Sequence, residues 1–460
     1  MSQSNFSTLN LSPALLKNLV TLDYHAMTPI QAEALPAILA GKDVIAQAQT
    51  GSGKTAAFAL GLLQKLKVKR FRIQSLVLCP TRELADQVAK EIRKLGRAVH
   101  NIKVLTLCGG APLGPQIGSL EHGAHIVVGT PGRIEDHLGK GTLSLGEVNL
   151  LILDEADRML EMGFQSQLDT IIASLTQQRQ TLMFSATFPE SIKKIAQQIM
   201  HQPVNVNVAS THDNSTIKQH LFMADNDGHR LQVLRLLLQH YQPQSAVVFC
   251  NTKIETQMLA DELSDYGYST MALHGDLEQR DRDQTLVRFV NKSISILVAT
   301  DVAARGLDIE SLDAVINYQI AREIEVHVHR VGRTGRAGKQ GIALTIITEK
   351  EKFKLARLEA YLQQKINVER LPAMNLLDKA VYQPAMLTLQ IDGGKKQKLR
   401  PGDILGGLTG VNGISGKQVG KIQIFANKAY VAVAREVAQY AMRKIADGKL
   451  KGRNFRVRII

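Results

Sequence analysis

The chain has 460 residues, which is enough for about three domains of ordinary size. Hydrophobic residues make up 44% and charged residues 21% of the sequence, a balance that excludes a disordered chain. No stretch reaches the roughly 18 consecutive apolar residues of a membrane span. The net charge of +14 is the unusual feature, and it favours a polyanionic partner, a nucleic acid before a membrane.

The N-terminal residues and the cysteines indicate a compartment. The first residues, MSQSNFSTLNLSPALL, have no basic segment leading into an apolar core, so we expect no secretory signal. Cys79, Cys108 and Cys250 lie in apolar runs without the spacing of a metal or disulfide site, which fits a reducing environment. We therefore expect a cytoplasmic protein, and nothing in the sequence suggests more than a monomer.

Short apolar runs alternate with helical patterns from residue 1 to about residue 365. Runs rich in Val, Ile and Leu without polar alternation are typical of parallel strands that helices cover on both faces. We read such strands at 43–48, 74–81, 103–108, 125–131, 150–157, 181–187, 246–252, 294–301, 313–318 and 342–347. The polar stretch 209–216 divides them into two groups and reads as a linker. The sequence therefore predicts an α/β fold with two parallel sheets.

The C-terminal part has a different pattern. Alternating apolar and polar residues predict half-exposed strands at 385–391, 419–425, 428–434 and 454–460, with helical patterns at about 403–409 and 434–446. The order strand, helix, strand, strand, helix, strand predicts a small ferredoxin-like α+β sandwich whose sheet has one open face. Residues 371–460 carry 16 Lys and Arg against 5 Asp and Glu, so most of the net charge of the chain lies there.

A phosphate-binding loop is predicted at 48–55, AQTGSGKT, between a strand and a helical pattern. Gly51 and Gly53 allow successive backbone N–H groups to turn toward phosphate oxygens, and the helix N-terminus adds its dipole. Lys54 can reach the outer phosphates, and Thr55 can bind Mg²⁺. A chance glycine-rich turn is the alternative, but strand, loop and helix come in the required order.

Three acidic residues, Asp154, Glu155 and Asp157, follow the apolar run 150–153. Carboxylates at the end of a buried strand are costly unless a positive group waits there, and ligands bind at that edge of a parallel sheet. We expect Asp154 to face the metal, partly through water, and Glu155 to orient the attacking water. The alternative is an acidic first turn of the following helix, which its dipole would favour.

Phosphoryl transfer also needs positive charge on the transition state, which an arginine can supply from a second lobe. The segment 329–338, HRVGRTGRAG, offers Arg330, Arg333 and Arg336 at helical spacing. Arg333 and Arg336 are the candidates for this role. A basic surface helix held by salt bridges is the alternative.

The ordered motifs together resemble those of the DEAD-box RNA helicases, over residues 1 to about 365. They are MTPIQ (27–31), AQTGSGKT (48–55), PTRELA (80–85), GG (109–110), TPGR (130–133), DEAD (154–157), SAT (185–187), VVFCNTK (247–253), HGDLEQRDR (274–282), ATDVAARGLDI (299–309) and HRVGRTGR (329–336). The resemblance implies two tandem RecA-like domains and an RNA-stimulated ATPase that uses ATP and Mg²⁺. The expected parts are an ATP-binding domain at 1–208, a linker at 209–216, a second RecA-like domain at 217–368, a linker at 369–384 and an RRM-like RNA-binding domain at 385–460.

The resemblance also implies residue roles at the nucleotide. Gln31 would recognise the adenine and Phe6 would stack on it, although Asp23 and Met27 stand where the family usually has Gly and Pro. The ATP-binding candidates are Phe6, Tyr24, Gln31, Gln49, Thr50, Gly51, Ser52, Gly53, Lys54, Thr55 and Asp308, the last at the ribose. The catalytic candidates are Lys54, Asp154, Glu155, Arg333 and Arg336.

The resemblance further implies a set of RNA contacts and of coupling residues. Ser185, Thr187 and His329 would couple the nucleotide state to strand separation. The residues expected to hold the RNA backbone are Arg82, Gly110, Thr130, Gly132 and Arg133 in the first domain and Gly275, Thr300 and Gly306 in the second. Small residues let a protein approach phosphates and sugars without reading bases, so this core is expected to be sequence-blind. The implied mechanism is local strand separation, with closure of the two lobes on ATP and RNA and reopening after hydrolysis.

The C-terminal domain resembles that of a bacterial DEAD-box subgroup addressed to 23S ribosomal RNA of the large subunit, which implies a role in ribosome assembly. A generic RNA-recognition module stacks bases on two or three strand aromatics, whereas 428–434 offers only Tyr430. We therefore expect contacts from Lys395, Lys396, Lys398, Arg400, Lys428, Tyr430, Lys451, Arg453 and Arg456. A domain that grips any RNA through phosphates is the alternative.

Two readings from other classes compete with an RNA helicase. A DNA translocase could share the phosphate loop and the catalytic arginine, but the MTPIQ and DEAD motifs argue against this class. A non-catalytic RNA-binding scaffold would have lost the chemistry, whereas Lys54, Glu155 and Arg333 are present.

Overall fold

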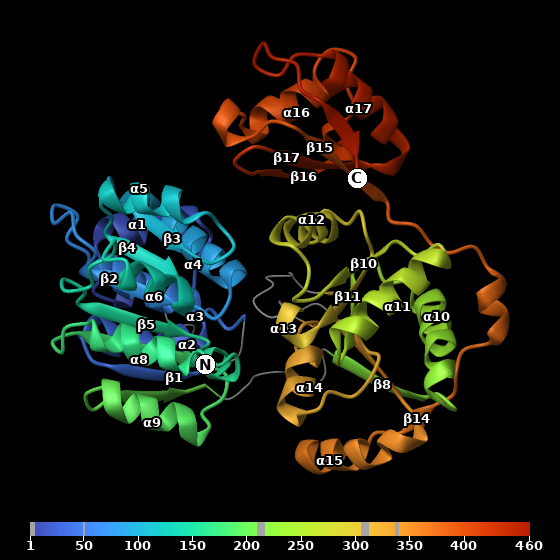
Figure 1. Ribbon diagram of the computed structural model, residues 1–460, viewed down its shortest axis with the longest axis horizontal. Helices are drawn as coiled ribbons and strands as arrows, with labels where there is room; N and C mark the ends of the chain where they lie inside the picture. The colour runs from blue at the N-terminus through green and yellow to red at the C-terminus, as the bar shows by residue number, and fades with distance from the viewer. Residues whose placement is uncertain (1–4, 49–50, 209–216, 305–311, 336–339) are drawn as a thin grey trace. The chain divides into compact units, whose positions relative to one another are not determined.

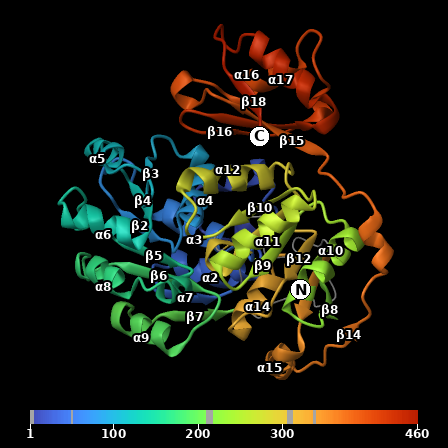
Figure 2. The same cartoon turned by 45° about the vertical axis from the view of Figure 1, so that its right-hand side comes forward.

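The computed structural model describes residues 5–48, 51–208, 217–304, 312–335 and 340–460 (Figure 1). The chain divides into two compact units, one formed by the residues before 209 and one by the residues after 216. The predicted linker 209–216 lies outside the described residues. Figure 2 shows the same elements turned by 45°, so that the strands of the second unit can be followed.

The first unit is built on a parallel sheet. Its described strands are ordered β3-β4-β2-β5-β6-β1-β7. They span β1 Val44–Gln47, β2 Ser75–Leu78, β3 Val104–Leu107, β4 Ile126–Gly129, β5 Leu150–Asp154, β6 Gln180–Ser185 and β7 Val204–Asn207. The helices are α1 Pro13–Thr21, α2 Pro29–Leu39, α3 Lys54–Lys65, α4 Arg82–Leu95, α5 Leu113–Glu121, α6 Pro131–Gly139, α7 Ala156–Glu161, α8 Gln165–Ala173 and α9 Glu190–Ile199.

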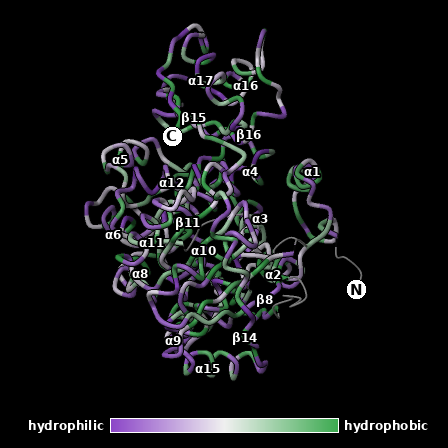
Figure 3. Tube along the Cα trace, turned by 90° about the vertical axis from the view of Figure 1, so that its right-hand side faces the viewer, coloured by the Kyte–Doolittle hydropathy of each residue, from purple (hydrophilic) through white to green (hydrophobic). Residues whose placement is uncertain are grey.

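Helices bury both faces of this sheet. Successive residues of a strand point to opposite faces, so neighbours in a strand belong to different cores. Val77 of β2 packs into the core under α1 to α4, whereas its neighbours Leu76 and Leu78 pack under α6 to α9. Phe58 of α3 lies against Phe184 of β6 with ring centroids 5.3 Å apart. Figure 3 shows hydrophobic residues concentrated along the inner elements. This double burial explains the continuous apolar runs of the sequence.

The second unit begins with another parallel sheet, ordered β10-β11-β9-β12-β13-β8-β14 within the described residues. The strands are β8 Ile217–Met223, β9 Ala246–Cys250, β10 Thr270–Leu273, β11 Ile296–Thr300, β12 Ala314–Asn317, β13 Gly341–Ile347 and β14 Val368–Glu369. The helices are α10 Arg230–Tyr241, α11 Lys253–Asp265, α12 Gln279–Val290, α13 Asp301–Ala304, α14 Ile324–Val331 and α15 Lys352–Leu362. Strand for strand, this order repeats that of the first sheet.

The C-terminal domain of the second unit has an antiparallel sheet, ordered β16-β17-β15-β18 in the described chain. Its elements are β15 Met386–Ile391, α16 Pro401–Thr409, β16 Val419–Ile424, β17 Ala429–Ala434, α17 Ala438–Asp447 and β18 Val457–Ile459. The two helices cover one face of the sheet, where Leu389, Val431 and Val433 pack with Ile404 and Ile445.

The expected fold class is confirmed: two parallel-sheet α/β domains and a small α+β domain with the predicted order of elements. One detail of the prediction was wrong. Helix α14 ends at Val331, so Arg333 lies in the turn after the helix and does not continue it at helical spacing. In the part of the chain that the structure describes, no helix is both long enough and apolar enough to cross a membrane.

Candidate active site and RNA interface

The predicted phosphate loop and the acidic residues come together at one edge of the first sheet. Strands β1, β5 and β6 are neighbours, and the loop before α3, the acidic turn after β5 and the turn after β6 all leave their carboxyl ends. Gly51 and Gly53 have φ angles of 88° and 95°, in the left-handed region that glycine adopts without strain. Half-buried Thr55 follows Lys54 in the first turn of α3. The sequence-predicted grouping is therefore present in the fold.

Lys54 and Asp154 are buried charged side chains of opposite sign at this edge. They are only 6% and 2% exposed, and among the described residues neither Lys54 Nζ nor Asp154 Oδ1 has a hydrogen-bond partner. Burial raises the pKa of Asp154 to about 7, while the positive charge of Lys54 acts in the opposite direction. Unpaired buried charges are costly, so these atoms fit a site completed by a ligand that carries phosphate and a cation.

Gln31 holds the phosphate loop to helix α2. Its side chain is 2% exposed, donates through Nε2 to the Gly53 carbonyl oxygen over 3.1 Å, and accepts at Oε1 from the Thr28 N–H over 3.0 Å. A Cβ at Gly53 would lie 2.6 Å from Gln31 Nε2 and 2.8 Å from Thr28 Oγ1. The space between this glycine and the start of α2 is therefore already full.

Phe6 and Tyr24 pack against each other near the start of the chain. Phe6 is 3% exposed, and the two rings meet edge to face with centroids 6.3 Å apart. The Tyr24 hydroxyl donates to Glu91 over 2.8 Å, and burial together with this carboxylate raises the pKa of Tyr24. In this structure both rings are directed into the protein, and Phe6 presents no open face for stacking.

The acidic turn is bonded directly to the turn after β6. Asp157 accepts hydrogen bonds at Oδ2 from the Thr187 N–H and hydroxyl, over 3.0 and 2.8 Å, and its own N–H donates to Ser185 Oγ over 3.2 Å. Burial raises the pKa of Asp157, but the bonds from Thr187 and the charge of Arg158 outweigh it and hold the pKa below its usual value. Glu155 occupies the left-handed region with φ 53°, a strained conformation for a side chain of its size.

The sequence prediction included Asp157 in the acidic run but gave it no role. The structure shows that it links the strand that carries Asp154 to Ser185 and Thr187. The spacing of the sequence carried no signal for this contact, because the partners lie 28 and 30 residues away.

The first-domain RNA candidates lie at the neighbouring part of the same sheet edge, beyond β2 and β4. Arg82 begins α4, and among the described residues its Nη1 is buried without a hydrogen-bond partner. Thr130 occupies the N-cap position of α6 without a side-chain cap hydrogen bond, and nothing lies within 4 Å of a Cβ at Gly132. Arg133 donates through Nη1 to the Ala111 carbonyl oxygen over 2.9 Å, which fixes the loop that contains Gly110 (φ 72°).

In the second unit, Gly275 follows β10 and Thr300 ends β11, and these strands are adjacent. Arg330 is buried and paired with Asp301, with Nε 2.6 Å from Oδ1, so it holds α14 to the start of α13 and its charge is already neutralised. Arg333 and His329 are half-buried. Five further candidates lie outside the described residues: Gln49, Thr50, Gly306, Asp308 and Arg336.

Two distant segments of the C-terminal domain join to form one basic surface. Lys451 Nζ donates to the Lys398 carbonyl oxygen over 2.9 Å, and the Asp392 N–H donates to the Arg456 carbonyl oxygen over 3.0 Å. We define the basic surface as the exposed side chains of Lys395, Lys396, Lys398, Arg400, Lys451, Arg453 and Arg456. The backbone at the start of the first segment is held by the turn between β16 and β17, because the Lys395 N–H donates to the Phe425 carbonyl oxygen over 2.8 Å.

The sheet face that the sequence left open is instead covered. Tyr430 is 7% exposed, Gln390 is 1% exposed, and Thr388 bonds to Asn291 and Ser293 of the same unit. Exposed aromatic surface comes from Phe425, which the sequence prediction missed; it is 37% exposed and packs edge to face on Tyr430, with centroids 5.5 Å apart.

Lys428 is half-buried beside this sheet face. Burial, followed by the nearby guanidinium groups of Arg280 and Arg458, lowers its pKa.

Family models match three segments of the chain: the DEAD/DEAH box helicase model at residues 28–195, the helicase conserved C-terminal domain at 229–338, and the DbpA RNA binding domain at 388–459. With the motifs and the buried nucleotide edge, these matches define the class: the chain belongs to the DEAD-box family of ATP-dependent RNA helicases.

Within that family the chain is similar to ATP-dependent RNA helicase DbpA of Escherichia coli, with 53% identity over 99% of both chains. DbpA of Bacillus subtilis is 36% identical, again over 99% of both chains. Among solved structures, Saccharomyces cerevisiae Dbp5 bound to RNA and ADP BeF3 matches with a TM-score of 0.72 and 30% identity, over 80% of this chain and 96% of that one. The DbpA relatives match through the C-terminal domain as well as the core.

Proposed function

We propose that this helicase separates short RNA duplexes locally and is directed by its C-terminal domain to 23S ribosomal RNA during assembly of the large ribosomal subunit. The observation that supports this RNA target is the basic surface, which has seven exposed Lys and Arg side chains on a domain that matches the DbpA RNA-binding model. We further propose that it acts in the cytoplasm as a monomer.

Lys54, Thr55 and Asp154 would hold Mg-ATP. Lys54 Nζ would contact the outer phosphates, and Thr55 and Asp154 would bind Mg²⁺, partly through water. The orphaned atoms of Lys54 and Asp154 support this fit. When bound, Mg²⁺ would neutralise charge on the phosphate oxygens. Glu155 would orient the attacking water from its strained position at the carboxyl end of β5.

Positive charge from the second lobe would complete this site. Arg333 and Arg336 would stabilise the charge that develops in the transition state. Gln49, Thr50, Ser52 and Asp308 would complete the nucleotide contacts, with Asp308 at the ribose. Gln31 would read the adenine while it holds the Gly53 carbonyl oxygen, and Phe6 and Tyr24 would support that end. Because Phe6 is buried here, stacking on the base would require its ring to turn outward.

Three residues would transmit the nucleotide state. Ser185 and Thr187 are bonded to the acidic turn through Asp157, so a shift of that turn on hydrolysis moves both side chains. His329 would receive this change in the second domain. The RNA backbone would be held by Arg82, Gly110, Thr130, Gly132, Arg133, Gly275, Thr300 and Gly306.

The basic surface would dock the motor at its target. Its lysines and arginines project from the turn before α16 and the turn after α17, so contacts to phosphates at two points of a folded RNA are available. Lys428 and the exposed edge of Phe425 would add contacts beside it, and buried Tyr430 would support the Phe425 ring. The competing proposal is a domain that grips any RNA through phosphates.

The test replaces Lys395, Lys396, Lys398 and Arg400 by Gln. A control replaces Lys379, Lys417, Lys421 and Arg443, four exposed basic residues outside the basic surface. We expect the first variant to lose activation of ATP hydrolysis by a 23S rRNA fragment while it keeps the low activity on poly(A), and the control to behave like the wild type. An equal loss of activity on both RNAs would favour the general phosphate grip.

A further inference from the structure

The two parallel sheets can be compared strand by strand, because their orders are the same. In the first sheet, β1 leads through the phosphate loop into α3, whose first residue is Lys54. In the second sheet, β8 occupies the corresponding position and leads into α10, whose first residue is Arg230. Both side chains are buried, at 6% and 2% exposure. The second unit therefore has its own counterpart of the nucleotide edge.

The charge of Arg230 is already used by the protein. The guanidinium donates to the carbonyl oxygens of Tyr318 and Ile346, over 2.7 and 3.0 Å, and pairs with Asp227 over 3.1 Å and with Glu351. Lys54 has no such partner among the described residues. Arg230 thus has little to offer a phosphate, and this edge needs a different kind of ligand.

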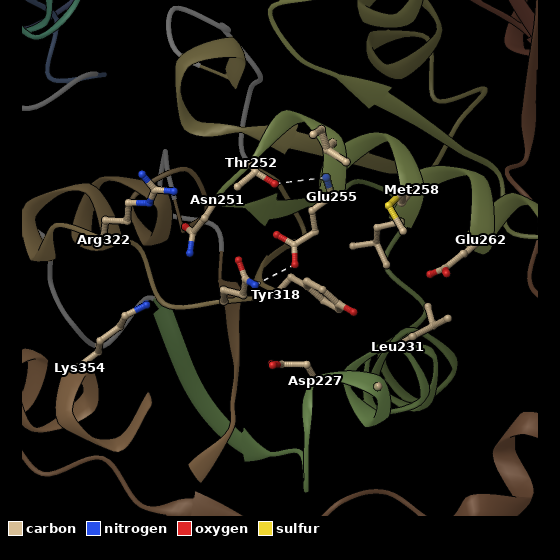
Figure 4. Close-up of a pocket in the computed structure, with 14 residues that line it drawn as sticks. Asp227, Leu231, Asn251, Thr252, Glu255, Met258, Glu262, Tyr318, Arg322 and Lys354 are labelled. Atoms are coloured by element: carbon tan, nitrogen blue, oxygen red, sulfur yellow. Dashed lines mark hydrogen bonds between the residues drawn. The ribbon is translucent and has the colours of Figure 1, made fainter. Parts of the chain in front are cut away.

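A pocket of about 810 Å³ opens beside Arg230, at the carboxyl ends of β9 and β12 (Figure 4). Three carboxylates line it: Asp227, Glu255 and Glu262. Figure 4 shows Arg322 and Lys354 on the opposite side of the pocket from Glu262. The pocket therefore has an acidic side and a basic side.

The acidic side is incompletely neutralised. The Glu262 carboxylate is exposed and makes no hydrogen bond or ion pair with the described residues. Glu255 accepts from Gln319 Nε2 over 2.8 Å, and burial raises its pKa, which a neighbouring cation would reverse. Gln319 Oε1 is buried and has no hydrogen-bond partner in the described structure, so it can accept from a ligand. This side favours a cation that donates hydrogen bonds and disfavours phosphate.

The rim next to the carboxylates is apolar. Ile254 and Met258 lie one turn apart on α11 and are 70% and 57% exposed, while Leu231 and Leu259 line the interior. A flexible methionine beside an apolar wall adapts to side chains of different shape. These exposed apolar side chains suit a ligand that carries an aliphatic group beside its charge.

We propose that this pocket binds an extended segment of a protein partner that carries a Lys or Arg next to an aliphatic residue. The cation would lie among Asp227, Glu255 and Glu262, and the aliphatic side chain would cover Met258 and Ile254. An acidic group farther along the same segment would meet Arg322 or Lys354. The charge pattern of the pocket is what selects this occupant.

The test uses the full-length protein with labelled methyl groups at Ile254 and Met258, observed by NMR. The probes are the tripeptide amides acetyl-Leu-Lys-Ile and acetyl-Leu-Glu-Ile, with spermidine and inorganic phosphate as further arms. We expect the Lys peptide alone to shift both methyl signals in a saturable manner. Glu262→Gln should weaken that binding about two- to fivefold, as expected for one partly exposed ion pair, whereas Asp265→Asn on the same helix should not.

Three outcomes would overturn the proposal: equal binding of the Lys and Glu peptides, no shift with either peptide, or the same shifts from spermidine at equal or higher affinity. The last result would assign the pocket to a small polycation. Met258→Ala gives an independent check, because it should weaken the Lys peptide and leave RNA-stimulated ATP hydrolysis unchanged.

Discussion

Replacing Gly53 by Ala tests how the phosphate loop depends on Gln31. Gly53 has φ 95°, so an alanine costs about 1 kcal/mol in backbone conformation alone. The new Cβ would also lie 2.6 Å from Gln31 Nε2 and must displace that side chain, which breaks its bonds to the Gly53 carbonyl and the Thr28 N–H. Two hydrogen bonds of a buried amide contribute about 2 kcal/mol together. We therefore expect the free energy of local unfolding at the phosphate loop to fall by about 3 kcal/mol in total.

Gly41→Ala is the matched control. Gly41 also has a positive φ, 78°, but nothing lies within 4 Å of an added Cβ, so only the backbone cost of about 1 kcal/mol applies. Hydrogen exchange of the segment that contains β1 and α3 measures the local stability, and titration with a fluorescent ATP analogue measures affinity. Gly53→Ala should weaken the analogue at least tenfold, and Gly41→Ala should leave its affinity unchanged.

Equal losses of stability in the two alanine variants, with nucleotide affinity unchanged in both, would show that Gly53 does not act through Gln31. Gln31→Ala combined with Gly53→Ala supplies a further check. With the amide removed, only the 2.8 Å contact of the new Cβ with Thr28 Oγ1 remains, so the second substitution should then cost less than it does in the presence of Gln31.

Three other predictions concern single side chains. Lys54→Met should abolish ATP hydrolysis and weaken fluorescent nucleotide binding by at least tenfold while circular dichroism stays unchanged; retained affinity would contradict the assignment of Lys54. Thr187→Val removes a hydroxyl that donates to Asp157 over 2.8 Å, a bond to a charged group worth about 1.5–3 kcal/mol, so duplex separation should fall more than RNA-stimulated hydrolysis; equal losses would argue against coupling. His327 is 2% exposed, and burial followed by the charge of Arg330 lowers its pKa to about 3, so the unfolded chain takes up the proton first and stability falls as the pH drops below about 6.5. At about pH 5 this loss amounts to about 2 kcal/mol, and urea unfolding of His327→Gln should lack it.

Most strands of the two parallel sheets were predictable because helices cover both of their faces. All ten apolar runs read from the sequence correspond to strands, such as Leu150–Asp154 and Ala246–Cys250. Strands β7, β8, β10 and β14 were not predicted. Val204–Asn207 alternates apolar and polar residues over only four positions at the edge of its sheet, and Ile217–Met223 mixes Lys, Gln and His with apolar residues. Their burial depends on neighbours that the local pattern does not contain.

The candidate site likewise has features that the local sequence predicts and features that it does not. Lys54 and Asp154 were each identified from a sequence motif. They meet at one sheet edge because parallel strands end there together. Contacts between distant residues were not predictable: the bonds of Asp157 to Thr187, the burial of Tyr430 and the exposure of Phe425 all depend on tertiary packing. Arg330 lies in the same basic segment as the candidate catalytic arginines, and its pairing with Asp301 shows a role in holding α14.

The most direct test of the proposed function is Mg-ATP hydrolysis by the full-length protein, measured alone and with poly(A), a set of 23S rRNA fragments and duplex DNA at equal nucleotide concentration. We predict strong activation by one ribosomal fragment, weak activation by poly(A) and none by duplex DNA. Equal activation by every RNA would contradict the proposed address, and activation by duplex DNA above any RNA would contradict the assignment as an RNA helicase.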